Sequence, residues 1–315
     1  MVNVPTIPLS NGVQLPALGL GTWLSSDPAQ LKTALRAALD CGYRYIDTAY
    51  LYKNEDVIGE VLQEYYDAGK FKREDIFITT KLPFYGHGKP EKFLKESLAS
   101  LRTTYIDLYL MHTPLPCKLA EDGKSPVVEG DKMLPELTPI IDTWRFLEKE
   151  YKAGTLKSIG ISNFNAKQIQ ELYDQAEVKP QNLQVELHIL FPQNELVDLC
   201  KKLKISVTSY GPLGSPGSQA VRGGVQANLL SRDLVVDLAK KYKKTPAQIL
   251  LRQIIQRGIS VIPKSTNPKR VQENFDVLDF EISAEDMKRF EEIKERVRLF
   301  EFGFARHHPW YPFEK

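Results

Sequence analysis

Short apolar runs alternate along this chain with longer amphipathic segments. Eight of the short runs predict buried strands, over residues 18–22, 43–47, 76–82, 106–112, 157–162, 183–187, 205–210 and 259–263. Most of these runs are apolar and β-branched almost throughout, which is typical of parallel strands that are covered on both faces.

The segments between these runs carry apolar residues at helical spacing. In the first segment, Ser26 or Asp27 can cap a helix, Pro28 occupies its first position, and Gly42 ends it. Comparable patterns predict helices over residues 54–66, 91–101, 139–154, 165–176, 194–203, 231–244, 245–258, 268–278 and 283–297.

Strands that alternate with helices, without a long linker, predict a single-domain (β/α)8 barrel over residues 1–315. A doubly wound parallel sheet is the alternative, and the lack of a G-x-G-x-x-G motif after any strand weighs against it. The Asn11-Gly12 pair predicts an N-terminal β-hairpin that covers the barrel bottom.

Long connections are expected to build a site at the opposite rim. They cover residues 113–138 and 211–230, and the C-terminal tail, 297–315, is aromatic enough to predict docking on the body.

Composition narrows the class of protein. A chain with 42% hydrophobic and 26% charged residues is typical of globular proteins. Its 42 basic and 40 acidic residues are spread evenly, so neither nucleic acid nor an anionic membrane is expected as a partner. Cys41, Cys117 and Cys200 lack disulfide or zinc-ligand spacing and indicate free thiols. No apolar run approaches the ~20 residues of a membrane span, so a cytoplasmic protein without a metal is expected.

Charged and polar residues stand at the ends of successive predicted strands. Asp47 and His112 end the second and fourth strands, and Lys81 lies near the end of the third. Glu186 and His188 follow the sixth. Each of these residues has an ordinary explanation when it is taken singly. An Asp at a strand end usually caps the next helix, a Lys extends its ammonium group to water, and a His is usually a satisfied hydrogen-bonding group. In a closed parallel barrel, however, all of them converge on one rim.

One arrangement gives these residues a shared chemistry. Asp47 pairs with Lys81, and the ammonium is expected to lower the pKa of a nearby phenol from ~10 toward working pH. The phenol then acts as a general acid toward a carbonyl oxygen that His112 orients. Tyr50 and Tyr52 are both candidates for this phenol.

The chain resembles the aldo-keto reductase family over essentially its whole length. The matching motifs, in order, are GLGTW (19–23), GYRYIDTAYLYKNE (42–55), ITTKL (78–82), DLYLMH (107–112), IGISNFN (159–165), QVELH (184–188) and VIPKSTNPKRVQEN (261–274). The family pattern I-D-T-A-x-x-Y selects Tyr52. The resemblance thus implies a catalytic tetrad of Asp47, Tyr52, Lys81 and His112, with Trp23, Tyr52 and His112 against a small carbonyl substrate.

The resemblance also implies NADPH bound across the rim of a monomeric barrel. Thr22 and Trp23 would flank the nicotinamide with Asp47 close by, Ser162, Asn163 and Gln184 would bond its carboxamide, and Tyr210 would stack on it. Leu213 and Ser215 would cover the pyrophosphate. Lys264, Ser265, Asn267 and Arg270 would surround the 2′-phosphate, with Glu273 and Asn274 near the adenine.

The KSTNPKR segment supports a phosphate site by its own chemistry. It offers cations and hydroxyl or amide donors before a helix that starts at Pro268. A dianionic 2′-phosphate would exploit that charge and a bare ribose would not, so NADPH is expected to bind more tightly than NADH.

The substrate pocket departs from mammalian members of the family. Pro83 and Thr113 stand where tryptophans are usual, so a wider pocket is expected, partly refilled by Phe84, Tyr85 and His87. His188 is expected to have a structural role.

A clasp over the cofactor is also missing, because Gly217 and Leu24 stand where relatives carry an acidic residue and a lysine. We expect NADP+ to leave faster than from clasped relatives. Stopped-flow release as slow as theirs would contradict this.

Two other functions fit parts of the pattern. A non-catalytic NADPH-binding or sensing protein could use the same barrel. A steroid double-bond reductase belongs to the same family, but that branch carries glutamate where this chain has His112.

Overall fold

The barrel predicted from the sequence is the core of the molecule. The computed structural model describes residues 4–218 and 227–313. Its main sheet has the order β3 (Leu20–Gly21), β4 (Tyr45–Asp47), β5 (Phe77–Leu82), β6 (Leu108–Met111), β9 (Ile159–Ser162), β10 (Asn182–Glu186), β11 (Ser206–Tyr210) and β12 (Ser260–Val261). All neighbours are parallel. Parallel bridges from Leu18 to Val261 and from Gly21 to Lys264 close the sheet, which excludes an open doubly wound sheet.

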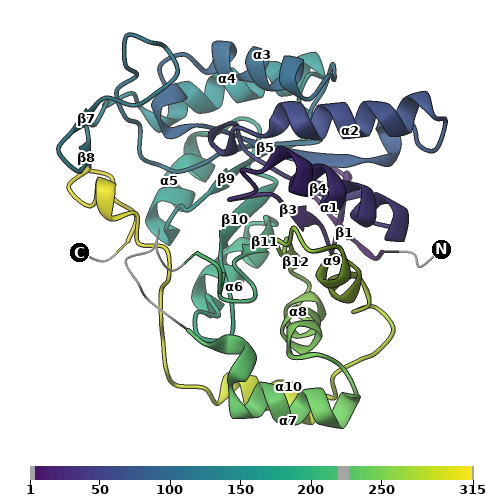
Figure 1. Cartoon of the computed structure of the whole chain (residues 1–315). Coiled ribbons are helices and arrows are strands. Elements are labelled where there is room, and N and C mark those ends of the chain that lie inside the picture. The colour runs from purple at the N-terminus through teal and green to yellow at the C-terminus, as the bar shows by residue number, and fades with distance from the viewer. Residues whose placement is uncertain (1–3, 219–226, 314–315) are drawn as a thin grey trace.

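Helices surround this sheet (Figure 1). They are α1 (Pro28–Cys41), α2 (Glu55–Asp67), α3 (Pro90–Ser100), α4 (Ile140–Ala153), α5 (Ala166–Gln175), α6 (Asn194–Lys202), α7 (Asp233–Tyr242), α8 (Pro246–Gln256), α9 (Pro268–Phe275) and α10 (Ala284–Glu291). Every predicted helix is present, although α10 ends at Glu291 rather than at residue 297. Asp27, not Ser26, caps α1, since its Oδ1 accepts hydrogen bonds from the backbone N–H groups of Ala29 and Gln30.

The helices α7 and α10 lie side by side outside the ring, below α8 in Figure 1. Val235, Leu238, Ile249 and Phe290 belong to a hydrophobic cluster that joins α7, α8 and α10. This cluster supports the segment that leaves α10 and carries the C-terminal tail back to the rim.

The N-terminal hairpin closes the barrel bottom, as predicted. β1 (Thr6–Pro8) and β2 (Gln14–Pro16) pair antiparallel. Asn11 Nδ2 donates to the backbone oxygen of Lys157 at 2.9 Å, and Leu9 and Leu15 pack with Tyr45 and Phe77 in one cluster. Because side chains fill the bottom of the barrel, a ligand is expected to approach the barrel axis from the carboxyl ends of the strands.

The rim carries a small hairpin and the docked tail. β7 (Val128–Glu129) and β8 (Lys132–Met133) were not predicted, because each is two residues long and largely exposed. The tail passes beside β8 (Figure 1), where His307 Nε2 donates to the Met133 oxygen at 3.0 Å. Gln168 Nε2 donates to the Trp310 oxygen at 2.8 Å, so the predicted docking of the tail is confirmed for its described residues.

Membrane-spanning helices and metal-ligand clusters are both absent from residues 4–218 and 227–313. In those ranges, no helix combines the length and hydrophobicity that a bilayer span requires. The same ranges hold no group of three or more His, Cys, Asp or Glu side chains that could ligate a metal ion.

Candidate functional site

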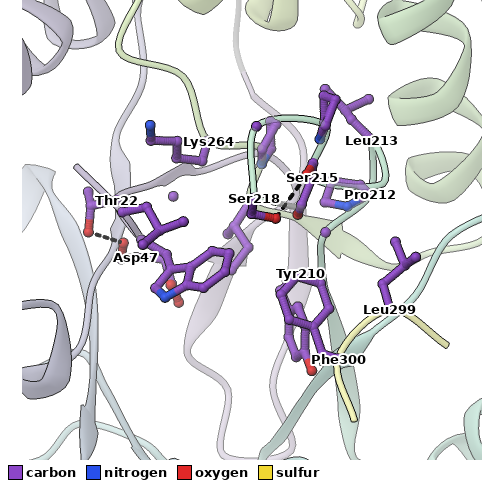
Figure 2. Close-up of a pocket in the computed structure, with 18 of the residues that line it drawn as sticks. Thr22, Asp47, Tyr210, Pro212, Leu213, Ser215, Ser218, Lys264, Leu299 and Phe300 are labelled. Atoms are coloured by element: carbon purple, nitrogen blue, oxygen red, sulfur yellow. Dashed lines mark hydrogen bonds between the residues drawn. The ribbon is translucent and has the colours of Figure 1, made fainter. Parts of the chain in front are cut away.

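One cleft of about 1670 Å³ lies at the carboxyl ends of the barrel strands and brings the predicted site residues together. Of the catalytic, cofactor-binding and substrate-binding residues that the family resemblance implies, every one lines this cleft except Lys81, which is bonded to Asp47. Figure 2 shows Thr22 and Asp47 on one side and Tyr210, Leu213 and Phe300 on the other.

Asp47 and Lys81 form a buried ion pair at the floor. Asp47 is the last residue of β4 and Lys81 is the next to last of the neighbouring strand β5, and their exposed fractions are 2% and 0%. Lys81 Nζ donates to Asp47 Oδ1 and to the Thr48 backbone oxygen, both at 2.7 Å. Gln184 Nε2 donates to Asp47 Oδ2 at 2.7 Å. Burial raises the pKa of Asp47 and lowers that of Lys81, and their mutual attraction opposes both shifts.

The geometry separates the two candidate tyrosines. Both lie in one 3₁₀ turn, η1 (Tyr50–Tyr52), directly after β4. Tyr52 lines the cleft, with its ring centroid 5.1 Å from Lys81 Nζ and 5.8 Å from the His112 ring centroid. Tyr50 instead donates from its hydroxyl to Glu96 Oε2 on α3 at 2.7 Å. Tyr52 is therefore the tyrosine that meets Lys81 and His112.

The pKa of Tyr52 differs from the expectation. Burial raises it above the ordinary value of 10.0, and the negative charge of Asp47 raises it further. The predicted lowering by Lys81 is wrong, because the ammonium is already bonded to Asp47 and its effect is smaller than the cost of burying a phenolate. A phenol with a raised pKa keeps its proton at neutral pH, as a proton donor requires.

His112 is held as a neutral imidazole. Burial lowers its pKa well below 6.5, and the positive charge of Lys81 lowers it further. Its backbone is fixed on both sides, since its N–H donates to the Leu82 oxygen at 3.2 Å and its carbonyl accepts from Asn163 Nδ2 at 2.9 Å. A neutral ring next to Tyr52 can donate one hydrogen bond without adding charge to the cleft.

Asn54 is a supporting residue that the sequence did not reveal. It precedes α2, where a helix cap is expected, yet its side chain makes no cap bond. Instead its Nδ2 donates to the Thr22 oxygen at 3.0 Å, and its Oδ1 accepts from Thr48 Oγ1 at 2.9 Å. Asn54 thus ties the loops after β3 and β4 together above the ion pair. Its place in a capping position concealed this role.

Amide and hydroxyl groups form a second cluster beside His112. Tyr210 donates from its hydroxyl to Asn163 Oδ1 at 2.7 Å, and Asn163 Nδ2 also donates to Ser162 Oγ at 3.0 Å. With Gln184 on the neighbouring strand, these groups present donors and acceptors that suit a planar carboxamide.

The far end of the cleft is positively charged. Asn267 Oδ1 caps α9 by accepting from the Arg270 N–H at 3.2 Å. Lys264 and Arg270 are exposed and line the cleft, and neither has a carboxylate within 4.0 Å among residues 4–218 and 227–313. Lys269, by contrast, pairs with Glu273 at 4.0 Å. Two cations without carboxylate partners at a helix N-terminus can bind a phosphate group.

Aromatic side chains line the remaining end, next to Trp23. Phe84 lines the cleft as expected and packs against Phe304 at 5.7 Å between ring centroids. Phe300, Phe302 and Phe304 come from the C-terminal tail, whose individual roles the sequence did not predict.

Two of the expected replacements for the missing tryptophans do not reach the cleft. Tyr85 is buried against Phe93, and His87 Nδ1 contacts Thr143 Oγ1 at 3.1 Å in the interior. Thr113 does line the cleft, at the position next to His112. Of the loop after β5, Phe84 lines the pocket, and the other phenylalanines that line it come from the tail.

Comparison with known proteins agrees with this geometry. The model of the aldo/keto reductase family matches residues 17–295. The chain belongs to the aldo/keto reductase family. It is an oxidoreductase whose reaction interconverts carbonyl and alcohol groups with a nicotinamide cofactor.

Individual relatives cover nearly the whole chain. Aldo-keto reductase family 1 member A1-A of Danio rerio is 44% identical over 93% of this chain and 91% of its own length. Aldo-keto reductase family 1 member A1 of Bos taurus is 42% identical over 92% of this chain and 90% of its own length. The solved structure of the aldose reductase from Schistosoma japonicum superposes with a TM-score of 0.90 at 39% identity, covering 98% of this chain and 99% of that one.

Proposed function

We propose that this aldo-keto reductase reduces aldehydes and ketones with NADPH and that Tyr52 is the proton donor. The observation that carries the proposal is the meeting of Tyr52 and His112 above the buried Asp47–Lys81 pair. A protonated phenol, a neutral imidazole and a nearby ammonium are groups that can together protonate a carbonyl oxygen and stabilise the resulting charge.

The roles of the side chains follow from their positions. Reduced nicotinamide supplies a hydride to the carbonyl carbon when it is bound. The nicotinamide ring would be held by Trp23 and Tyr210. Its carboxamide would be bound by Ser162, Asn163 and Gln184. All five residues line the cleft, which supports these roles.

Proton transfer is assigned to the groups at the floor of the cleft. His112 would donate a hydrogen bond to the substrate oxygen and orient it toward Tyr52. As negative charge develops on that oxygen, the proton passes to it from the Tyr52 hydroxyl. Lys81 then stabilises the phenolate, and Asp47 keeps Lys81 in place.

Aromatic or otherwise apolar carbonyl compounds are the substrates that best fit the pocket. Its walls next to Trp23 are Phe84, Phe300, Phe302 and Phe304. We expect kcat/KM to be higher for aromatic aldehydes than for sugars in an NADPH-oxidation assay. A preference for sugars would contradict this assignment.

We further expect the enzyme to act as a cytoplasmic monomer.

Cofactor choice is expected to depend on the cations near α9. Replacing Arg270 by Met should weaken NADPH binding roughly 10- to 100-fold, because a charge-assisted bond to the 2′-phosphate is lost. NADH lacks that phosphate, so its dissociation constant should hardly change. Fluorescence titration of both cofactors measures the two constants.

Lys269 provides the matched control for this experiment. It lies on the same helix but pairs with Glu273, so Lys269→Met should leave the ratio of the two constants close to the natural value. Equal affinity of the natural protein for NADPH and NADH would refute the preference, and an equal effect of both substitutions would refute the role of Arg270.

A further inference from the structure

A buried carboxylate ties the C-terminal tail to the barrel. Glu186 is the last residue of β10 and is 1% exposed. Its Oε1 accepts from the Leu299 N–H at 2.6 Å, and its Oε2 accepts from the Phe300 N–H at 3.0 Å. His188 Nε2 also contacts Oε1, at 2.9 Å. Both oxygens of one side chain are thus committed to two successive backbone amides of a segment more than a hundred residues away in sequence.

The anchored segment places one aromatic ring between two others. The ring centroid of Phe300 lies 5.4 Å from that of Trp23 and 5.2 Å from that of Tyr210, at interplanar angles of 67° and 84°. Tyr210 and Phe300 are seen together on one wall of the cleft in Figure 2. Edge-to-face contacts of this kind depend on ring position, so a shift of the backbone at Phe300 would disturb the wall.

We propose that Glu186 is a positioning residue that acts through Phe300 and sets the affinity of the enzyme for apolar carbonyl substrates. The inference rests on the proposed function, in which Trp23 and Phe300 form the wall of the substrate pocket. Glu186 itself touches neither the substrate nor the reacting atoms in this account.

The chemistry of the anchor requires a carboxylate. Two N–H donors are satisfied by two acceptor oxygens, and a glutamine amide offers only one oxygen. In Glu186→Gln one backbone N–H would therefore face an NH2 group or lose its partner while buried, and both outcomes are unfavourable.

The disturbance should stay local. Val297 N–H donates to the Leu190 oxygen at 3.0 Å before the anchor, and the guanidinium carbon of Arg298 lies 3.6 Å from the Phe313 ring centroid. Further along, Asn165 Nδ2 donates to the Pro312 oxygen at 3.0 Å. These contacts hold the tail on both sides, so the segment at Leu299 and Phe300 can shift without release of the whole tail.

A double-mutant cycle tests the proposal. We expect Glu186→Gln to raise KM for an aromatic aldehyde roughly tenfold, with a smaller effect on kcat. Phe300→Ala should raise KM comparably. If Glu186 acts through Phe300, adding Glu186→Gln to Phe300→Ala should change KM little further, because the ring it positions is already gone. Effects on KM that multiply in the double variant would overturn the proposal.

Two further variants keep the result interpretable. Ser209→Ala is the matched control, because Ser209 is equally buried on the neighbouring strand but donates to the Leu187 oxygen at 2.7 Å and not to the tail. It should leave KM unchanged. Should Glu186→Gln fail to fold, Glu186→Asp replaces it in the cycle, since it keeps both oxygens but shortens their reach. We then expect a smaller rise in KM that again vanishes beside Phe300→Ala.

The outcomes also separate this inference from the proposed function. A natural protein that turns over no carbonyl compound would count against the proposed function. A natural protein that turns over aromatic aldehydes, with KM unchanged by both substitutions at Glu186, would overturn only the role of Glu186.

Discussion

Replacing Tyr52 by Phe should lower kcat for aldehyde reduction by about 10²- to 10⁴-fold, the usual contribution of a general acid. The substitution removes the hydroxyl that donates the proton and leaves the ring beside Lys81 and His112. Because the proposed cofactor contacts lie elsewhere in the cleft, the dissociation constant for NADPH should change by less than about threefold. Initial rates of NADPH oxidation and a binding titration measure the two quantities.

Tyr50 supplies the control within the same turn of chain. Its hydroxyl bonds to Glu96 on α3, so Tyr50→Phe should keep kcat within a few-fold of the natural value. An active Tyr52→Phe enzyme would show that another group donates the proton. Loss of NADPH binding in that variant would mean that Tyr52 holds the cofactor rather than the substrate.

Replacing Lys81 by Met should destabilise the fold by about 3–5 kcal/mol, because it leaves the buried Asp47 carboxylate without its counter-charge. Gln184 remains as a neutral partner but cannot balance the charge. Activity should also fall strongly, since the phenolate of Tyr52 loses the ammonium that stabilises it. Urea denaturation and NADPH oxidation measure the two effects separately.

The double variant Asp47→Asn, Lys81→Met distinguishes stability from catalysis. Removing both charges should recover much of the free energy of unfolding, because no buried charge is left unpaired. It should not restore kcat, because no ammonium faces Tyr52. Recovery of activity together with stability would show that the pair serves only the fold.

The sequence predicted the fold well because its pattern is local and repeated. Buried apolar runs and helical spacing predicted all eight barrel strands and the α-helices α1 to α10 of the described residues, and the Asn11-Gly12 turn predicted the bottom hairpin. β7 and β8 were missed because strands of two exposed residues leave no such pattern.

The convergence of Asp47, Lys81 and His112 followed from their places at the ends of parallel strands. The tail contacts could not be inferred in this way, because Glu186 and Phe300 meet through the path of an irregular segment. Tyr85 and His87 turned inward because a short 3₁₀ turn, η3 (Phe84–Gly86), follows β5 and directs only Phe84 to the cleft.

The pKa of Tyr52 was predicted in the wrong direction for a related reason. Sequence order indicates which charges are neighbours, but it does not indicate how deeply a phenol is buried. Burial sets the direction here, and the charge of Lys81 is already engaged by Asp47.

The most direct test of the central claim is the transfer of deuterium from NADPH deuterated at C4 of the nicotinamide to an aromatic aldehyde. Mass spectrometry of the product should find the alcohol with deuterium on its carbinol carbon, and Tyr52→Phe should form it far more slowly. Failure to form a labelled alcohol from any aldehyde or ketone, while NADPH still binds, would contradict the account and leave a cofactor-binding protein on the same barrel.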